Sequence, residues 1–139
     1  MFRQTFSTNL FGAVAVLEAF LPLVRRSPAG RIVNVSTTMG SLADQTNPES
    51  PYFSLVVPAY QSSKTALNTV TIALAKQLDG TSIKVTSVCP GFVRTGLAPA
   101  AKEAPLAPED AAEVVYRAAR LPDSAMSGTF IDAHGEVAW

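Results

Sequence analysis

The sequence has few of the residues that build disulfides or metal sites. It contains one cysteine, Cys89, and one histidine, His134. A single cysteine excludes an internal disulfide, which favours a cytoplasmic protein. Because no second histidine or cysteine stands beside either residue, we expect no metal site. Cys89 follows the apolar run IKVTSV and is expected to be a buried, inert thiol, whereas His134 lies in a turn-like tail, DAHGEV.

Net charge is also absent, because eleven basic residues balance eleven acidic ones. Without a net field, we expect neither nucleic acid nor an anionic membrane as a partner. The only basic cluster is Arg25, Arg26 and Arg31, which we interpret as solvating a helix end and a turn. With 47% hydrophobic residues in 139, the chain can bury a core, and we expect one domain over residues 1–139.

An apolar stretch near the start, LFGAVAVLEAFLPLV, superficially resembles a signal peptide. Glu18 interrupts it, no A-x-A cleavage site follows, and the run is expected to be too short to span a membrane. Its apolar residues instead recur every three or four positions, which predicts an amphipathic helix over residues 5–26. The predicted apolar stripe is Phe6, Leu10, Val14, Leu17, Leu21 and Val24.

The remaining chain alternates between short apolar runs and longer helical patterns. Strands are predicted at RIVNVS (31–36), IKVTSVCPG (83–91) and GTFIDA (128–133). Helices are predicted over residues 59–78 and from about residue 107 onward. This order is typical of the α/β class with a parallel sheet. The residues expected to be buried by the second helix are Ala66, Leu67, Val70, Ala73 and Leu74.

An unusually long connection, Thr38 to Pro58, separates the first strand from the second helix. A structureless loop of this length is usually a lid or a binding loop. Ligands of parallel α/β sheets lie at the carboxyl ends of the strands. Thr37, Pro90 and Gly91 are expected at that edge, beside the loop.

The stretch AYQSSK places Tyr60 and Lys64 four residues apart. On a helix the two side chains share one face, one turn apart. A phenol beside an ammonium can be an acid–base pair, and the charge is expected to lower the pKa of the phenol. An exposed pair that does nothing is the alternative.

Four motifs occur in a familiar order: TNLFG, GRIVNVSTTMG, YQSSK and VCPGFVRT. Together they resemble the short-chain dehydrogenases/reductases, in particular their carbonyl-reductase-like members. The resemblance implies a Rossmann-like parallel sheet with flanking helices. It also implies transfer of a hydride between a nicotinamide cofactor and a carbonyl or alcohol of a small molecule. Tyr60, Lys64, Thr37 and Asn9 would be catalytic.

By this resemblance, Asn9 would hold a water molecule of a proton relay. Thr37 stands at the position where the family usually has a catalytic serine. The added methyl of Thr37 restricts its rotamers and narrows the pocket, and Ser36 is expected to be structural. The cofactor-binding residues implied by the resemblance are Tyr60, Lys64, Pro90, Gly91 and Thr95. The cofactor would be NADP or NAD, with NADP favoured. The two long helices resemble the family's pairing surface, so a homo-oligomer is a further possibility.

The chain lacks G-x-G-x-x-G, T-G-x-x-x-G-x-G and N-N-A-G. The N-terminal half of the fold, with its phosphate-binding turn, is therefore expected to be missing, and the chain is interpreted as the catalytic half. It would be a piece of a longer oxidoreductase. A short remnant acting as an inactive interaction or partner subunit is the first alternative, and a lyase or epimerase on the same scaffold is the second. The segment SPYFSLVVP suggests an apolar wall for the substrate, and Trp139 either covers that pocket or packs onto the body of the protein.

Overall fold

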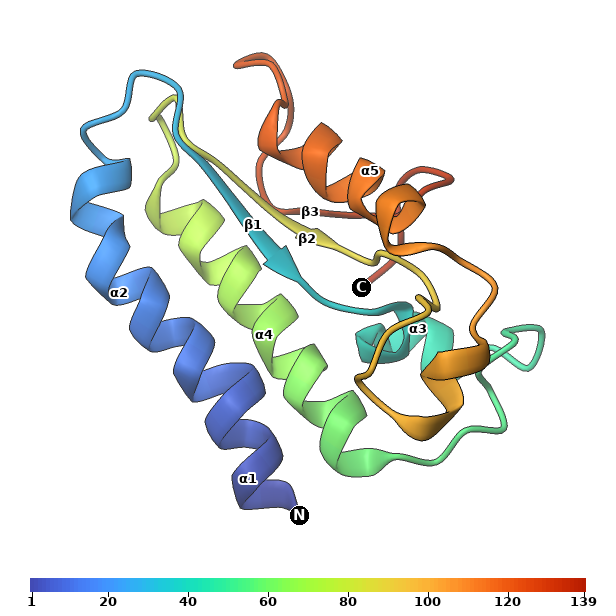
Figure 1. Cartoon of the computed structure of the whole chain (residues 1–139). Helices are drawn as coiled ribbons and strands as arrows, with labels where there is room; N and C mark the ends of the chain where they lie inside the picture. The colour runs from blue at the N-terminus through green and yellow to red at the C-terminus, as the bar shows by residue number, and fades with distance from the viewer.

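The computed structural model describes all 139 residues and contains one parallel sheet. Its strands are β1 (Arg31–Val35), β2 (Lys84–Val88) and β3 (Thr129–Ile131), in the spatial order β1-β2-β3 (Figure 1). Arg31 pairs with Lys84, and Thr86 pairs with Thr129. The predicted Rossmann-like α/β fold with flanking helices is therefore confirmed.

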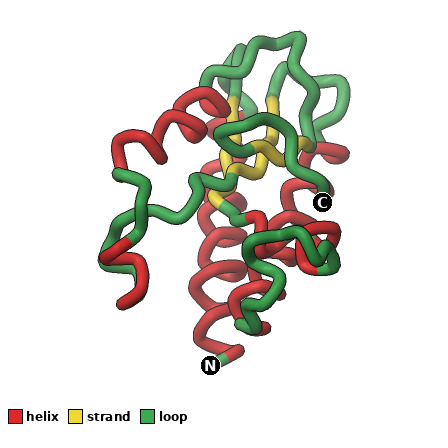
Figure 2. Tube along the Cα trace, turned by 90° about the vertical axis from the view of Figure 1, so that its right-hand side faces the viewer, coloured by secondary structure: helices red, strands yellow, loops and turns green.

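Helices enclose the sheet on both faces (Figures 1 and 2). The helical elements are α1 (Phe2–Phe6), the π-helical turn η1 (Ser7–Gly12), α2 (Ala13–Val24), the 3₁₀ turn η2 (Thr38–Gly40), α3 (Leu42–Gln45), α4 (Pro58–Gln77), the 3₁₀ turn η3 (Pro99–Glu103) and α5 (Pro108–Ala119). Pro58 and Pro108 each stand at the start of a helix, where a missing N–H costs nothing.

The first three helical elements join into one rod, Phe2–Val24, that lies along α4 (Figure 1). Each residue of its predicted apolar stripe is half-buried, and none is fully buried. The expectation that this stretch is too short to span a membrane was wrong. It counted only residues 10–24, whereas the helix has 23 residues and, by length and composition alone, could cross one.

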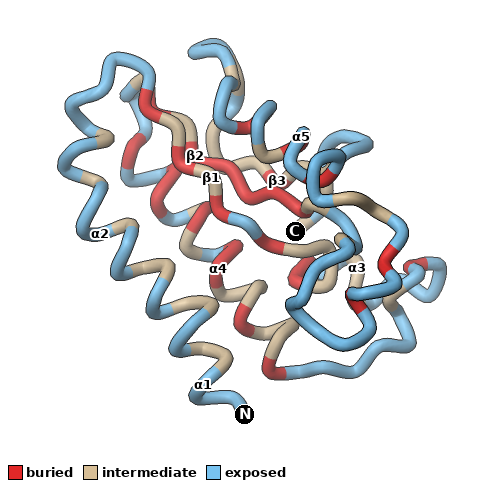
Figure 3. The backbone as a smooth tube through the Cα atoms, viewed as in Figure 1, coloured by how far each residue is buried: buried red, intermediate tan, exposed pale blue.

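The core has two layers, one on each face of the sheet (Figure 3). On one face Ile32 and Val85 pack against α4, with α2 contributing half-buried side chains. On the other face Val88 packs against Val114 and Ala118 of α5. Helix α4 buries Leu67 and Leu74 as predicted, while Ala66 and Val70 are only half-buried.

Ala73 is exposed, contrary to expectation, because the face of α4 that meets the sheet is partly polar. Thr71 is fully buried there, and its hydroxyl accepts hydrogen bonds from the amide of Asn34 (2.8 Å) and the hydroxyl of Ser87 (2.9 Å). These contacts satisfy polar groups that would otherwise destabilise the interior. Sequence patterning identified only the apolar half of this interface.

The two edges of the sheet are covered differently. After β3 the chain turns back at residues 132–135 and runs antiparallel to the strand, with Ile131 bridged to Glu136. Trp139 then stacks on Phe130, with ring centroids 5.5 Å apart. Trp139 therefore packs onto the body, one of the two arrangements expected for it. No strand pairs with the outer edge of β1.

The long connection is not structureless, because polar side chains organise it. Ser41 caps α3 by accepting the N–H of Asp44 at 3.0 Å. The Asp44 carboxylate accepts the hydroxyl of buried Ser50 at 2.9 Å. The carbonyl of Trp139 accepts the N–H of Ala43 at 3.0 Å, which ties this loop to the end of the chain.

Candidate active site

The candidate site lies at the carboxyl end of β1, against the first turns of α4. Tyr60 and Lys64 lie one helical turn apart, and the Lys64 ammonium is 6.0 Å from the centroid of the Tyr60 ring. Lys64 Nζ reaches across to β1 and donates to the carbonyl of Val35 at 2.8 Å. This contact fixes the lysine between the helix and the strand end.

Thr37 is the second residue after β1, and its side chain lies near the Tyr60 phenol. Its hydroxyl accepts the N–H of Met39 at 3.3 Å, which caps η2. Thr37 also lies close enough to Tyr60 for its side chain to lower the pKa of the phenol. Ser36, in contrast, is buried, and its hydroxyl has no hydrogen-bond partner. The structure thus brings Thr37, and not Ser36, to Tyr60.

Gly40 determines how closely η2 approaches α4. A Cβ at this position would lie 2.9 Å from Cβ of Lys64 and 3.0 Å from its carbonyl carbon. The Gly40 carbonyl accepts the Thr65 hydroxyl at 2.9 Å and the Asn68 amide at 3.4 Å. Only glycine permits this contact, which sets the position of Thr37 relative to Tyr60 and Lys64.

Asn9 lies within the π-helical turn η1, where one wide turn interrupts the rod. Such turns often occur at functional sites. The Asn9 amide nitrogen donates to the hydroxyl of Ser63 at 3.1 Å, and that hydroxyl donates to the carbonyl of Tyr60 at 2.8 Å. Asn9 is therefore linked to the tyrosine-bearing turn. The sequence interpretation missed Ser63, although its place directly before Lys64 was visible.

Burial is the main influence on the pKa values of Tyr60 and Lys64. It raises the pKa of Tyr60 above its usual value of 10.0; the neighbouring Cys89 adds to this increase, and the Thr37 hydrogen bond opposes it. Burial also lowers the pKa of Lys64 from 10.5. The expected lowering of the phenol pKa is not the net result in this structure, because desolvation of the phenolate is the largest effect and raises that pKa.

The other residues expected to bind cofactor lie on the segment after β2. Pro90 is half-buried at the strand end, and Gly91 has a φ of +86°, a conformation that favours glycine. Thr95 is exposed, and its hydroxyl accepts the N–H of Leu97 in its own loop at 3.3 Å. No hydrogen bond joins Thr95 to the Tyr60 cluster. Cys89 is buried, as predicted.

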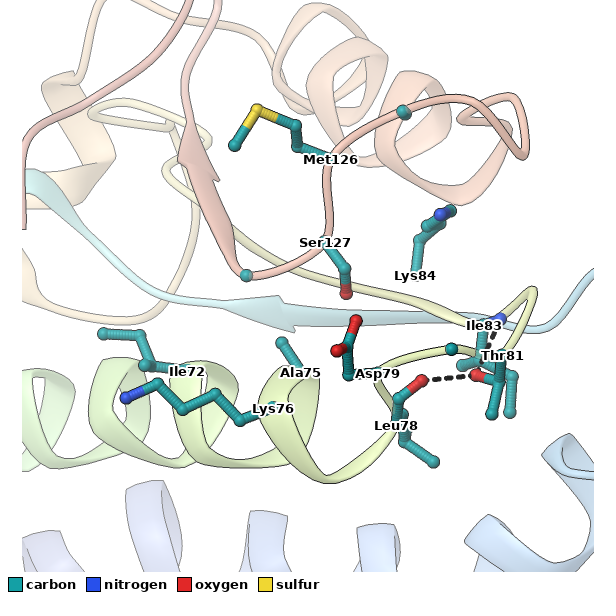
Figure 4. Close-up of a pocket in the computed structure, with 13 residues that line it drawn as sticks. Ile72, Ala75, Lys76, Leu78, Asp79, Thr81, Ile83, Lys84, Met126 and Ser127 are labelled. Atoms are coloured by element: carbon teal, nitrogen blue, oxygen red, sulfur yellow. Dashed lines mark hydrogen bonds between the residues drawn. The ribbon is translucent and has the colours of Figure 1, made fainter.

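Two of the hollows in the molecule bear on the choice of a ligand site. The one beside the site, about 430 Å³, lies between η1, α2, β1 and α4, and its lining includes Asn9, Lys64 and Val35. The larger one, about 500 Å³, lies at the amino ends of β2 and β3, where Asp79 and Ser127 point toward one another (Figure 4). It shares no residue with the Tyr60 cluster. The smaller groove shares Lys64 and Asn9 with the site, although Tyr60 and Thr37 do not line it, and we take it as the candidate ligand site.

The site places a tyrosine, a lysine and a hydroxyl together at the carboxyl edge of a parallel α/β sheet, and comparison with known proteins identifies the family. A family model described as short chain dehydrogenase matches residues 1–105. The chain is 38% identical over 98 residues to the short-chain dehydrogenase anuI of Penicillium roqueforti, covering 68% of this chain and 39% of that protein. It is 30% identical to (-)-isopiperitenone reductase of Mentha piperita over an alignment 160 positions long, which covers 88% of this chain and 48% of that protein.

Solved structures give the same result. Salutaridine reductase from Papaver somniferum superposes with a TM-score of 0.75 at 28% identity, covering 93% of this chain and 54% of that one. Carbonyl reductase Sniffer of D. melanogaster gives 0.73 at 26% identity, covering 96% and 55%. The chain belongs to the short-chain dehydrogenase/reductase family and is carbonyl-reductase-like, as the sequence motifs predicted. It spans about half, or less, of the length of these relatives.

Proposed function

We propose that residues 1–139 form one partial Rossmann-like domain that carries the acid–base chemistry of an NAD(P)-dependent oxidoreductase. The reaction is reduction of the carbonyl of a small molecule, or oxidation of the corresponding alcohol. The observation that supports it best is the convergence of Thr37 and Lys64 on Tyr60 at the carboxyl edge of the sheet. In this arrangement Tyr60 would be the acid, Lys64 the charge that stabilises its conjugate base, and Thr37 the second hydrogen-bonding group.

Tyr60 acts as the acid in the reductive direction. Its raised pKa keeps the phenol protonated at neutral pH, so the proton is available for the carbonyl oxygen of a substrate. The Thr37 hydroxyl lies beside the same phenol, where it lowers the pKa of Tyr60, and it would hold that oxygen as the second hydrogen-bonding group. As the proton leaves, the Lys64 ammonium, on the next turn, stabilises the phenolate. The nicotinamide cofactor supplies the hydride when it is bound.

The residues present fit one end of such a cofactor. Lys64 and Asn9 offer polar atoms along the 430 Å³ groove, and Gly91 adopts a positive φ on the segment that follows β2. Tyr60, Lys64, Pro90, Gly91 and Thr95 would bind the nicotinamide end. No glycine-rich turn of the pyrophosphate-binding type occurs in these residues. We retain NADP or NAD as the cofactor, with NADP favoured.

The substrate would lie between Tyr60 and the long loop, whose exposed Phe53, Leu55 and Val56 offer an apolar wall. We further propose that the protein is cytoplasmic. We also propose that it forms a homo-oligomer whose subunits pair through the Phe2–Val24 rod and α4.

One observation favours a second candidate, an interaction or partner subunit. The outer edge of β1 has no neighbouring strand, and Val16, Phe20 and Leu23 on the nearby rod are exposed. Unpaired strand edges invite association.

Titration of the purified chain with NADPH and with NADH, followed by turnover of a panel of aldehydes and ketones, tests the proposal. We expect cofactor binding and turnover that Tyr60→Phe abolishes. Tyr116→Phe, which removes an exposed hydroxyl on α5, is the matched control and should leave turnover unchanged. A folded chain that binds neither cofactor would favour the partner subunit. Turnover that survives Tyr60→Phe would overturn the assigned mechanism.

A further inference from the structure

Ser63 is a fully buried hydroxyl at the junction of two helical elements. It lies on α4 between Tyr60 and Lys64, and its side chain faces the π-helical turn η1. A serine hydroxyl has one proton to donate and lone pairs to accept with. Both capacities are used here, toward two different residues of the candidate site.

The proton of Ser63 goes to the carbonyl of Tyr60, at 2.8 Å. This assignment is forced, because a carbonyl oxygen cannot donate. The hydroxyl oxygen therefore has only lone pairs left for Asn9, 3.1 Å away. A group facing those lone pairs must be a donor, so the Asn9 carboxamide presents its NH₂ to Ser63.

The other end of the same carboxamide is left unused by the protein. No hydrogen bond within the chain reaches Asn9 Oδ1, and Asn9 lines the groove together with Lys64. We propose that Ser63 is a positioning residue that fixes the Asn9 carboxamide with its NH₂ toward α4, which reserves its oxygen as a hydrogen-bond acceptor for the groove. The orientation rests on the contacts alone, whereas its kinetic consequence rests on the proposed function.

With the NH₂ held, Asn9 Oδ1 can accept a hydrogen bond from a water molecule or from an ammonium in the groove. Without Ser63, the carboxamide can turn about its last bond and present the NH₂ to the groove, which removes the acceptor. The π-helical turn adds to this control, since it sets the place of Asn9 on the rod before the side chain orients. Ser63 thus acts through Asn9 and not on the substrate.

The test is a double-mutant cycle with Ser63→Ala, Asn9→Ala and the double variant. Ser62→Ala is the matched control, because the Ser62 hydroxyl bonds only carbonyls of its own helix, those of Pro58 and Ala59. The first readout is the pair of side-chain NH₂ resonances of Asn9 in a ¹⁵N correlation spectrum, assigned by their loss in Asn9→Ala. We expect Ser63→Ala to shift this pair and to increase its hydrogen-exchange rate about tenfold, while Ser62→Ala leaves both unchanged.

The second readout is turnover of a carbonyl compound across pH. We expect Ser63→Ala to lower kcat about tenfold with little change in KM, and to have no further effect in the Asn9→Ala background. Ser63→Thr, which keeps the hydroxyl, should restore the Asn9 resonances. An unshifted Asn9 pair in a folded Ser63→Ala variant refutes the inference, and so do additive kinetic effects. If the parent chain shows no turnover, the proposed function fails, while the spectrum still decides the orientation of Asn9.

Discussion

Replacement of Gly40 by alanine tests the close contact between η2 and α4. The new Cβ would lie 2.9 Å from Cβ of Lys64, 3.0 Å from its carbonyl carbon and 3.2 Å from the nitrogen of Thr65. Carbon atoms normally pack at about 3.5–4.0 Å, so the shortfall at the first contact is roughly 0.6–1.1 Å. Two of the three atoms belong to the backbone of α4 and cannot rotate away.

The η2 turn must therefore move away from the helix, which also lengthens the 2.9 Å bond from the Thr65 hydroxyl to the Gly40 carbonyl. Overpacking of this kind costs about 1–3 kcal/mol, and a weakened hydrogen bond adds about 1 kcal/mol. We expect Gly40→Ala to lower the free energy of unfolding by about 2–4 kcal/mol. The displacement should also separate Thr37 from Tyr60 and impair catalysis in a chain that turns over.

Urea denaturation followed by the fluorescence of Trp139, the only tryptophan, measures the loss. Gly96→Ala is the matched control, because a Cβ there meets no atom within 4 Å and the backbone φ is not positive. That variant should be neutral or up to about 1 kcal/mol more stable. Equal stabilities for the two variants, with equal denaturant slopes, would refute the reasoning about Gly40.

Three further predictions concern single side chains. Since folding raises the pKa of Tyr60, the contribution of this phenol to stability is complete below pH 10.0 and is lost as the pH rises through the folded pKa. Ultraviolet titration should show a phenol that ionises above pH 10.0 and whose signal disappears in Tyr60→Phe. Ionisation of Tyr60 below pH 10.0 would contradict the prediction. Thr71→Val should cost about 2–5 kcal/mol in urea denaturation, because it leaves the buried Asn34 and Ser87 donors unsatisfied, whereas Thr69→Val, on the exposed face, should cost less than about 0.5 kcal/mol. Trp139→Ala should speed proteolytic cleavage within residues 42–57, since it removes the stacking on Phe130 that holds the carbonyl bonded to Ala43; unchanged cleavage would show that the loop is held by its own contacts.

The sequence was most informative where one residue type has one physical use. Short apolar runs that alternate with helical patterns along the chain predicted the three parallel strands. The spacing of Tyr60 and Lys64 placed both residues on one helical face. The choice of Thr37 over Ser36 followed from motif alignment, and the effect of Thr37 on the pKa of Tyr60 supports it. Their catalytic roles stay predictions.

The sequence was less informative where a polar residue can be either buried or exposed. Ser63 and Thr71 are fully buried, yet their patterns do not differ from those of exposed helical residues, because only partners distant in sequence show their use. The pKa of Tyr60 was misjudged for a related reason. Spacing showed the nearby charge, whereas the extent of burial depends on the whole fold.

Because the two edges of the sheet differ, another chain can pair with only one of them. The hairpin after β3 occupies one side, so the backbone of that strand has no free row of donors and acceptors. On β1, residues 32 and 34 point their backbone groups at β2, which leaves those of Arg31 and Val33 facing outward. Further strands can therefore add at one side only, and two copies that joined there would each block the other's growth. Concentrated solutions of this chain should accordingly form dimers rather than fibrils.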